Sequence, residues 1–311
     1  MAELTPKEYK EKMQMQEKEA YALLDEQTNK IMKNERLLAH FLDLLAAHCA
    51  TSVSNTLLVQ AQFSNASPEL TAVTTINEWK NRNISVRKDA NGYYPRGIYQ
   101  FVNDGYYTAD NGDMCMKFKV AKGYDASQTD SPDYARQVMK SVRPIKVFVG
   151  TSDIEATRNI ALCNSSKIRC LIWSPEKLIN DAENISEEAG VRYVPETKTV
   201  IIRKLPREDW FARVSCEIAM GLFHQREGSE FKRENHTFEC GIIAYLLCRN
   251  AGVDVSNFRF DLSKVSDKYP DYGQFRAMLN NCLEMSHDMA FRLNSKLTDQ
   301  NRRSQNQPVC V

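Results

Sequence analysis

The chain has 311 residues, of which 42% are hydrophobic and 26% are charged, and this composition excludes a disordered or fibrous protein and leaves room for two globular domains. The formal net charge of +1 excludes a uniformly basic nucleic-acid-binding protein, so any nucleic-acid surface has to be local. No apolar run is long enough to span a bilayer, which excludes a membrane-spanning protein.

The first half is predicted to contain two helices and then a small sheet. Thr5-Pro6-Lys7-Glu8 has the pattern of a capping box with proline at the first helical position, and it predicts a helix to about Lys33. Asn34 can cap a second helix that ends near Cys49. From residue 84 to residue 120, short apolar and aromatic runs alternate with turn signals, which predicts an antiparallel sheet with tight hairpins. The turn signals are Asn91-Gly92, Asp104-Gly105 and Asn111-Gly112.

A basic segment at residues 136–146 separates these elements from the second half and indicates a domain boundary. Beyond it, the sequence predicts strands at 145–149, 168–173, 191–194 and 200–203. Helices are predicted around Phe211–Leu222, from about Asn235 to Asn250, and from about Asp271 to Leu297. The predicted fold class is α+β, with N-terminal helices and a small antiparallel sheet followed by an α+β domain that ends in long helices. The predicted domains are 1–140 and 141–298, with a polar tail at 299–311.

The β region combines aromatic and basic side chains, which is the combination that single-stranded nucleic acid requires for base stacking and phosphate neutralisation. The residues at or beside turns are the best candidates for binding. A structural alternative also applies, because aromatic residues in a small sheet are often part of the core and because acidic residues dilute the charge. The candidate nucleic-acid-binding residues are Trp79, Arg87, Lys88, Tyr93, Tyr94, Arg96, Tyr106 and Tyr107.

The predicted helix around Phe211–Leu222 contains the outline of a zinc-peptidase motif. In the pattern His-Glu-x-x-His, two histidines one helical turn apart bind zinc and the glutamate activates the bound water. Glu217 has the position of that glutamate, whereas Cys216 and Met220 stand where the histidines belong. A thioether is a poor zinc ligand. The sequence therefore predicts no zinc at this motif.

The order of these parts resembles antirestriction proteins of the ArdC type and their LtrC-like relatives on conjugative elements. In the first half, the resemblance is carried by Asn55-x-Leu57-Leu58-Val59-x-Ala61-Gln62, the Trp79 helix and Tyr124-Asp125-Ala126-Ser127-Gln128-Thr129. In the second half, it is carried by a strand pair, residues 216–224, residues 239–247 and Gly252-Val253-Asp254. It covers most of the chain except roughly residues 140–190.

The resemblance implies an N-terminal single-stranded-DNA-binding domain and a zinc-metallopeptidase-like C-terminal domain. The metal-ligand segment of such relatives is acidic, but here Thr237 and Gly241 stand where glutamates are expected and only Glu239 remains. The expected function is that of a bacterial mobile-element protein that protects or handles transferred single-stranded DNA by occupying it. The second domain is expected to lack its zinc ligands, and no enzymatic activity is expected.

Two other classes of function remain open. A hydrolase could use a rearranged metal site built from Cys216, His224, His236, Cys240 or Glu239, or a cysteine nucleophile at Cys216 with His224 or His236 as base. Alternatively, the chain could be a protein-interaction scaffold with an unknown protein partner. Nine cysteines without a Cys-x-x-Cys pair and a polar N-terminus without a secretory signal predict a cytoplasmic location and no membrane partner.

Overall fold

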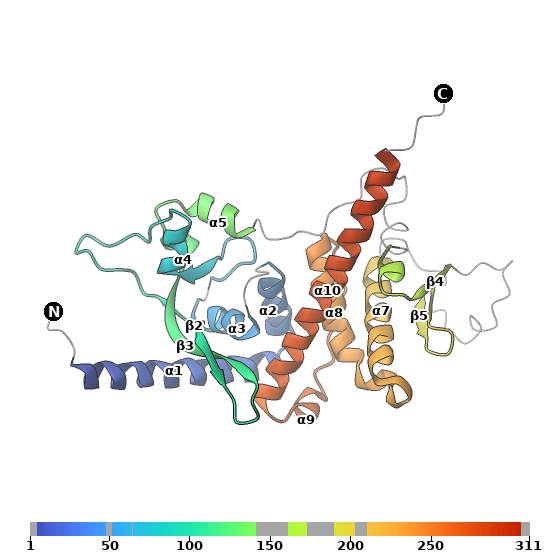
Figure 1. The fold of residues 1–311 in the computed structure, drawn as a ribbon, viewed down its shortest axis with the longest axis horizontal. Helices are drawn as coiled ribbons and strands as arrows, with labels where there is room; N and C mark the ends of the chain where they lie inside the picture. Colours follow the sequence, from blue (N-terminus) through green and yellow to red (C-terminus); the bar gives the residue numbers. More distant parts are fainter. Residues whose placement is uncertain are drawn as a thin grey trace. The chain divides into compact units, whose positions relative to one another are not determined.

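The computed structural model describes residues 5–47, 52–63, 65–140, 161–172, 190–202 and 210–305. The chain divides into two compact units (Figure 1). The first comprises Met1–Arg143 together with Leu262–Arg276, and the second comprises Pro144–Asp261 and Ala277–Val311. Residues 262–276, which the sequence analysis placed in the second domain, thus cluster with the first unit. The predicted strand at 145–149 lies outside the described residues.

The helices of the first unit begin and end where their capping residues indicate. In α1 (Pro6–Lys33), the Thr5 hydroxyl accepts from the Glu8 amide and the Glu8 carboxylate accepts from the Thr5 amide at 2.8 Å, as the capping box predicts. The Asn34 side chain accepts from the Leu37 amide at 3.0 Å at the start of the next helix. The other helices of this unit are α2 (Glu35–Ala47), α3 (Val53–Gln62), α4 (Ile76–Asn81), α5 (Pro132–Lys140) and the short α9 (Val265–Lys268).

The sheet of the first unit is antiparallel, in the order β1-β3-β2. Its strands are β1 (Val73–Thr75), β2 (Ile98–Thr108) and β3 (Met114–Asp125). The register shifts between Asn103 and Tyr106, where Asp104-Gly105 forms a bulge and not the predicted hairpin turn. The first of the apolar runs predicted to form the sheet, at residues 84–86, contributes only one bridge, between Val86 and Thr129.

Helix α3 covers the outer edge of β2 through two side-chain amides. The Asn55 side chain exchanges two hydrogen bonds with the backbone of Phe101, at 2.7 and 3.0 Å, and the Gln62 side chain does the same with Tyr99, at 2.9 and 3.3 Å. Each amide therefore replaces the donor and acceptor of a neighbouring strand, which removes part of an exposed sheet edge. The sequence motif that begins at Asn55 and ends at Gln62 thus has a structural role.

The second unit packs two antiparallel helices beside a small mixed sheet. In the order β4-β6-β5, β4 is parallel and β5 antiparallel to the central strand. The apolar side chains Phe211, Val214 and Ile218 of α7 are fully buried, as their spacing predicts. The elements are β4 (Arg169–Ile172), β5 (Val191–Val194), β6 (Thr199–Ile202), α7 (Trp210–Glu227), α8 (Thr237–Ala251) and α10 (Tyr272–Gln305), whose first turn belongs to the first unit. None of the helices described here is both long and apolar enough to cross a bilayer.

Candidate nucleic-acid interface

A pocket of about 300 Å³ lies between the loop that precedes β2 and the turn that follows β3. The loop is organised by Asp89, whose carboxylate accepts from the amides of Asn91 and Tyr93 at 2.9 and 2.8 Å. This arrangement fixes a tight turn, Asp89–Gly92, whose fourth residue Gly92 has a φ of +81°. The pocket is lined by Arg87, Lys88, Asp89, Tyr93, Tyr94, Pro95, Ser127 and Gln128.

Gln128 holds the loop and the turn together. Its side-chain oxygen accepts from the Asp125 amide at 2.8 Å, and its side-chain nitrogen donates to the Arg96 carbonyl at 3.1 Å. On the other side of the pocket, the Arg87 guanidinium donates to the Ser127 carbonyl at 2.5 Å. Gln128, noted in the sequence only as part of a motif, therefore positions the basic loop.

Tyr93 and Tyr94 line this pocket and differ in how much of their side chains is exposed. Tyr93 is 53% exposed and Tyr94 is 42% exposed. The Lys88 ammonium lies 4.8 Å from the centre of the Tyr94 ring, and the Tyr124 ring lies 6.0 Å from it. Tyr94 is therefore partly engaged by its neighbours, and Tyr93 is the more available ring for stacking on a base.

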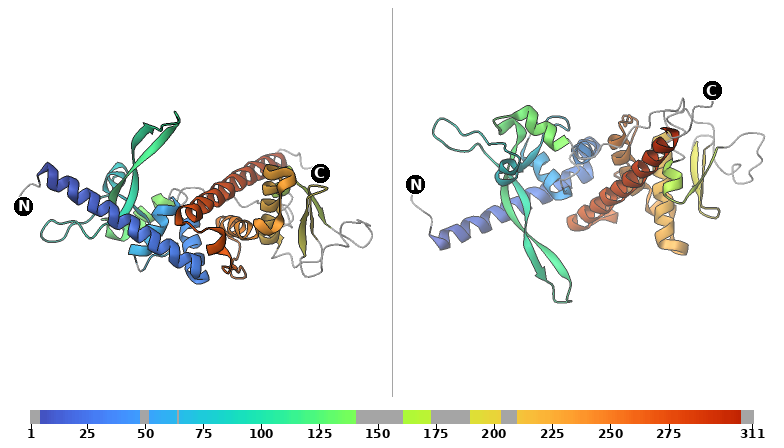
Figure 2. Two further views of the ribbon diagram at one scale, coloured as in Figure 1. Left: turned by 90° about the horizontal axis from the view of Figure 1, so that it is seen from below. Right: turned by 45° about the horizontal axis from the view of Figure 1, so that its top comes forward.

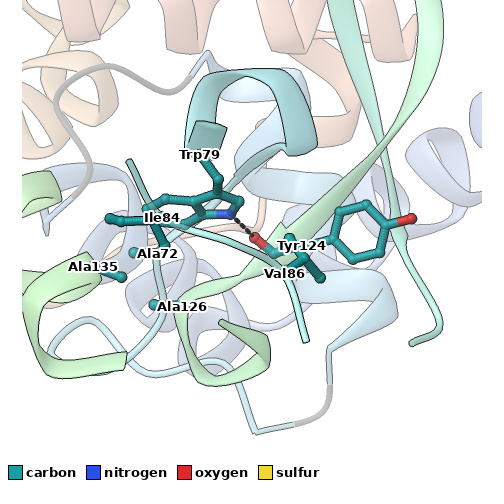
Figure 3. Packing of buried hydrophobic residues seen from close by; sticks show 7 residues of the cluster. All are labelled: Ala72, Trp79, Ile84, Val86, Tyr124, Ala126 and Ala135. Atoms are coloured by element: carbon teal, nitrogen blue, oxygen red, sulfur yellow. Dashed lines mark hydrogen bonds between the residues drawn. The ribbon is translucent and has the colours of Figure 1, made fainter. Parts of the chain in front are cut away.

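Trp79 cannot stack on a base, contrary to the sequence-based prediction. Its side chain is fully buried in a cluster with Ile84, Val86 and Tyr124, and its indole nitrogen donates to the Tyr124 carbonyl at 2.9 Å (Figure 3). A buried indole whose only polar group is already paired is a core residue. Trp79 supports the interface indirectly, because Tyr124 also contacts Tyr94.

The structure separates Tyr106 and Tyr107 from this pocket. Both lie near the far end of β2, about 26–30 Å along the strand from Ile98 at about 3.3 Å per residue. Their side chains point to opposite faces, because successive residues of a strand alternate. Tyr107 pairs with Cys115 and shares its face with Lys117 and Lys119, whereas Tyr106 pairs with Met116. The eight candidates thus form a pocket group, a strand-end pair and one core residue.

In the second unit, Glu217 has partners on both carboxylate oxygens. One oxygen accepts from the Tyr193 amide of β5 at 2.6 Å, and the other accepts from the Arg233 guanidinium. The residue is only 8% exposed. A carboxylate held by a strand amide and a guanidinium acts as a structural connection between α7, β5 and the segment before α8.

The three sulfur-containing residues near Glu217, namely Cys216, Met220 and Cys240, are partly or fully buried. Met220 and Cys240 are buried, and the Cys240 thiol lies 4.0 Å from the Met220 sulfur. Burial, followed by the Glu217 charge, raises the pKa of the Cys216 thiol to about 12. Burial also raises the pKa of Cys240 well above its ordinary value. Both thiols are therefore protonated near neutral pH, which is unfavourable for a nucleophile or a metal ligand.

Each of the two candidate histidines has a hydrogen-bond partner other than Cys216. His224 contacts the Tyr193 hydroxyl through Nδ1 at 3.0 Å, and His236 contacts the Glu227 carboxylate through Nε2 at 2.9 Å. The His236 ring stacks on Phe223, with ring centres 4.2 Å apart. The His236 contacts join the end of α7 to the start of α8, and the His224 contact joins α7 to β5, so both histidines have structural partners.

The residues at the motif do not fit a zinc ion. A zinc site requires three or four nitrogen, oxygen or thiolate ligands around one point. Here the positions are occupied by a buried thioether, protonated thiols and a carboxylate paired with an arginine. Glu239 is buried on α8. Within the described ranges, no group of three or more His, Cys, Asp and Glu side chains could hold a metal ion.

Comparisons with known proteins find a likeness in structure. No family model matches the chain, and no curated protein matches it. The metal-free structure of the antirestriction protein ArdC from the R388 plasmid is 13% identical, with a TM-score of 0.44 over 80% of this chain and 84% of that chain. The Mn(II)-bound structure of ArdC from the same plasmid is 12% identical, with a TM-score of 0.47 over 84% of this chain and 98% of that chain.

Proposed function

We propose that the first unit binds single-stranded DNA at the pocket formed by the 87–96 loop and the 126–129 turn. The observation that carries this proposal is the exposed ring of Tyr93 in a pocket that is also lined by two exposed cations, Arg87 and Lys88. A third exposed cation, Arg96, follows in the same loop. Stacking on an aromatic ring requires a base whose face is free, which a single strand provides and a duplex does not. The pocket volume of about 300 Å³ is at the small end of ligand sites, and it suits one base.

The pocket is suited to binding many sequences. The Gln128 side-chain amide and the Asp89 carboxylate are already engaged in hydrogen bonds within the protein. Base edges are read by free donors and acceptors, whereas stacking and phosphate contacts tolerate any base. We therefore expect only weak preference among single-stranded sequences.

In this proposal, the second unit is a metallopeptidase-like domain that has lost its zinc ligands and serves as a scaffold. The support is the pairing of Glu217 with Arg233 and the Tyr193 amide, together with the buried sulfur atoms of Met220 and Cys240. The protein as a whole would then belong to a mobile genetic element and act in the cytoplasm. It would protect transferred single-stranded DNA by occupying it, which is an antirestriction role of the kind named for ArdC.

The test compares two tyrosine variants in the full-length chain by fluorescence anisotropy with a labelled single-stranded oligonucleotide. Tyr93→Ala is expected to weaken binding by about tenfold, because stacking on one aromatic side chain contributes about 1–3 kcal/mol. The matched control is Tyr9→Ala on α1, since Tyr9 is similarly exposed at 58%, and it should leave the affinity unchanged. Equal affinities for wild type and Tyr93→Ala would refute the role of the pocket.

A further inference from the structure

The far ends of β2 and β3 form a two-stranded arm, residues 103–108 and 114–119, that extends beyond α1 (Figure 2). Strand β1 pairs with β3 only at Gly123–Asp125, so it does not reach the arm. Helix α3 binds the backbone of β2 only at Tyr99 and Phe101. Two strands alone have little to bury their side chains against, so the residues of the arm, apart from the half-buried Cys115, are exposed on both faces.

The strand register sorts these residues into two chemically different faces. Asn103 pairs with Phe118, Tyr106 with Met116, and Thr108 with Met114, and paired residues share a face. Contacts of Asn103 with the Met116 sulfur at 3.5 Å and of Thr108 with the Met114 sulfur at 3.8 Å agree with this assignment. We call these six residues the uncharged face of the arm. The opposite face has Tyr107, Cys115, Lys117 and Lys119.

The uncharged face exposes four large apolar side chains to solvent. Met114 is 71% exposed, Tyr106 64%, Met116 52% and Phe118 51%. None of the six residues of this face has an ionisable group at neutral pH. The charges of the arm lie elsewhere, with Asp104 paired to Lys119 at 2.6 Å and to Lys117 at 3.9 Å. A contiguous apolar patch on an extended arm is typical of a protein interaction site.

The chemistry of this face selects among possible partners. Nucleic acid requires cations to neutralise phosphates, and an anionic membrane surface requires them as well, yet the face has none. An uncharged apolar face fits another uncharged apolar face. A second copy of this chain presents one, and a two-fold axis would place the two faces together with the lysines directed outward. With a net charge of +1, two copies repel each other little.

We propose that the uncharged face of the β2–β3 arm is the interface through which two copies of this chain associate. This interface is separate from the Tyr93 pocket and does not depend on DNA binding. Of the adjacent tyrosines Tyr106 and Tyr107, only Tyr106 lies on this interface.

The test is sedimentation velocity of the full-length chain over concentrations from about 1 to 200 µM. Wild type should pass from monomer to dimer within this range, and Phe118→Lys should raise the dimer dissociation constant by at least about tenfold. Tyr107→Lys is the matched control, because it adds the same charge to the opposite face of the same arm and should leave association unchanged. Both residues are exposed, at 51% and 52%, so both variants should fold, which circular dichroism checks.

Three results would overturn the proposal. These are a wild type that stays monomeric throughout, a Phe118→Lys variant that dimerises as wild type does, and a Tyr107→Lys variant that is as impaired as Phe118→Lys. Binding of a short oligonucleotide separates this proposal from the function of the pocket, because Phe118→Lys should bind it with wild-type affinity, whereas Tyr93→Ala should dimerise normally.

Discussion

Replacing Glu217 distinguishes a structural carboxylate from a catalytic one. In a working peptidase, loss of the motif glutamate removes activity and leaves the fold intact. Here Glu217→Ala removes a bond from the buried Tyr193 amide and an ion pair with Arg233. Each hydrogen bond that involves a charged group contributes about 1.5–3 kcal/mol. The contribution of the Glu217–Arg233 ion pair is at the lower end of this range, because 32% of the Arg233 side chain is accessible and solvent screens the pair.

The sum for Glu217→Ala is a loss of about 3–4 kcal/mol in the free energy of unfolding. For a domain of about 150 residues, this loss corresponds to a decrease in Tm of about 6–16 °C. Glu217→Gln keeps an acceptor for the Tyr193 amide and loses only the charge, so it should cost about half as much. Differential scanning calorimetry of both variants measures these shifts.

The control for this series is Glu230→Ala, an exposed glutamate in the short 3-10 helix that follows α7, which should change Tm by less than about 1–2 °C. A Glu217→Ala variant with wild-type Tm would refute the structural role of this carboxylate. Loss of a peptidase activity at unchanged stability would refute it as well and would support the hydrolase alternative.

Three further predictions concern Trp79, Gln128 and Cys216. Trp79→Ala should destabilise the first unit by about 3–5 kcal/mol, because it empties a fully buried site, and urea unfolding monitored by circular dichroism measures this loss. Gln128→Ala should weaken single-strand binding with little loss of stability, because it frees the Arg96 carbonyl from the turn that positions the loop; anisotropy beside a melting curve separates the two effects. The Cys216 thiol, with a pKa of about 12, should react slowly with iodoacetamide at pH 8, and the rate of this reaction should rise with pH until the pKa is passed. Mass spectrometry of the Cys216 peptide measures the extent of labelling. Fast labelling at pH 8 would contradict a raised pKa of this thiol.

Features set by neighbouring residues were predictable from the sequence. The α1 capping box needs only Thr5 and Glu8, which lie three residues apart, and the apolar stripe of α7 follows from its helical spacing. The α+β class and the antiparallel sheet follow from the change of period between the helical segments and the region after residue 84. These patterns are local, so tertiary contacts did not have to be known.

Features set by distant contacts were not predictable. Trp79 has an aromatic side chain near basic residues, and only its bond to the Tyr124 carbonyl, 45 positions away, shows it to be a core residue. The bulge at Asp104-Gly105 has a sequence typical of a hairpin turn, but the register of β2 and β3 places the turn between Thr108 and Met114. Arg233 had no sequence signal as a partner for Glu217, since the pair forms through the fold of the segment between α7 and α8.

The most direct test of the proposed function is the affinity of the wild-type protein for single-stranded and duplex oligonucleotides of equal length over a salt series. Single-strand binding should be the tighter of the two, because only the single strand offers a free base to Tyr93. If Arg87, Lys88 and Arg96 each neutralise one phosphate, log K should fall with log salt with a slope of about −2. Equal affinity for the two DNA forms, or an affinity that does not change with salt, would contradict single-strand binding at this pocket.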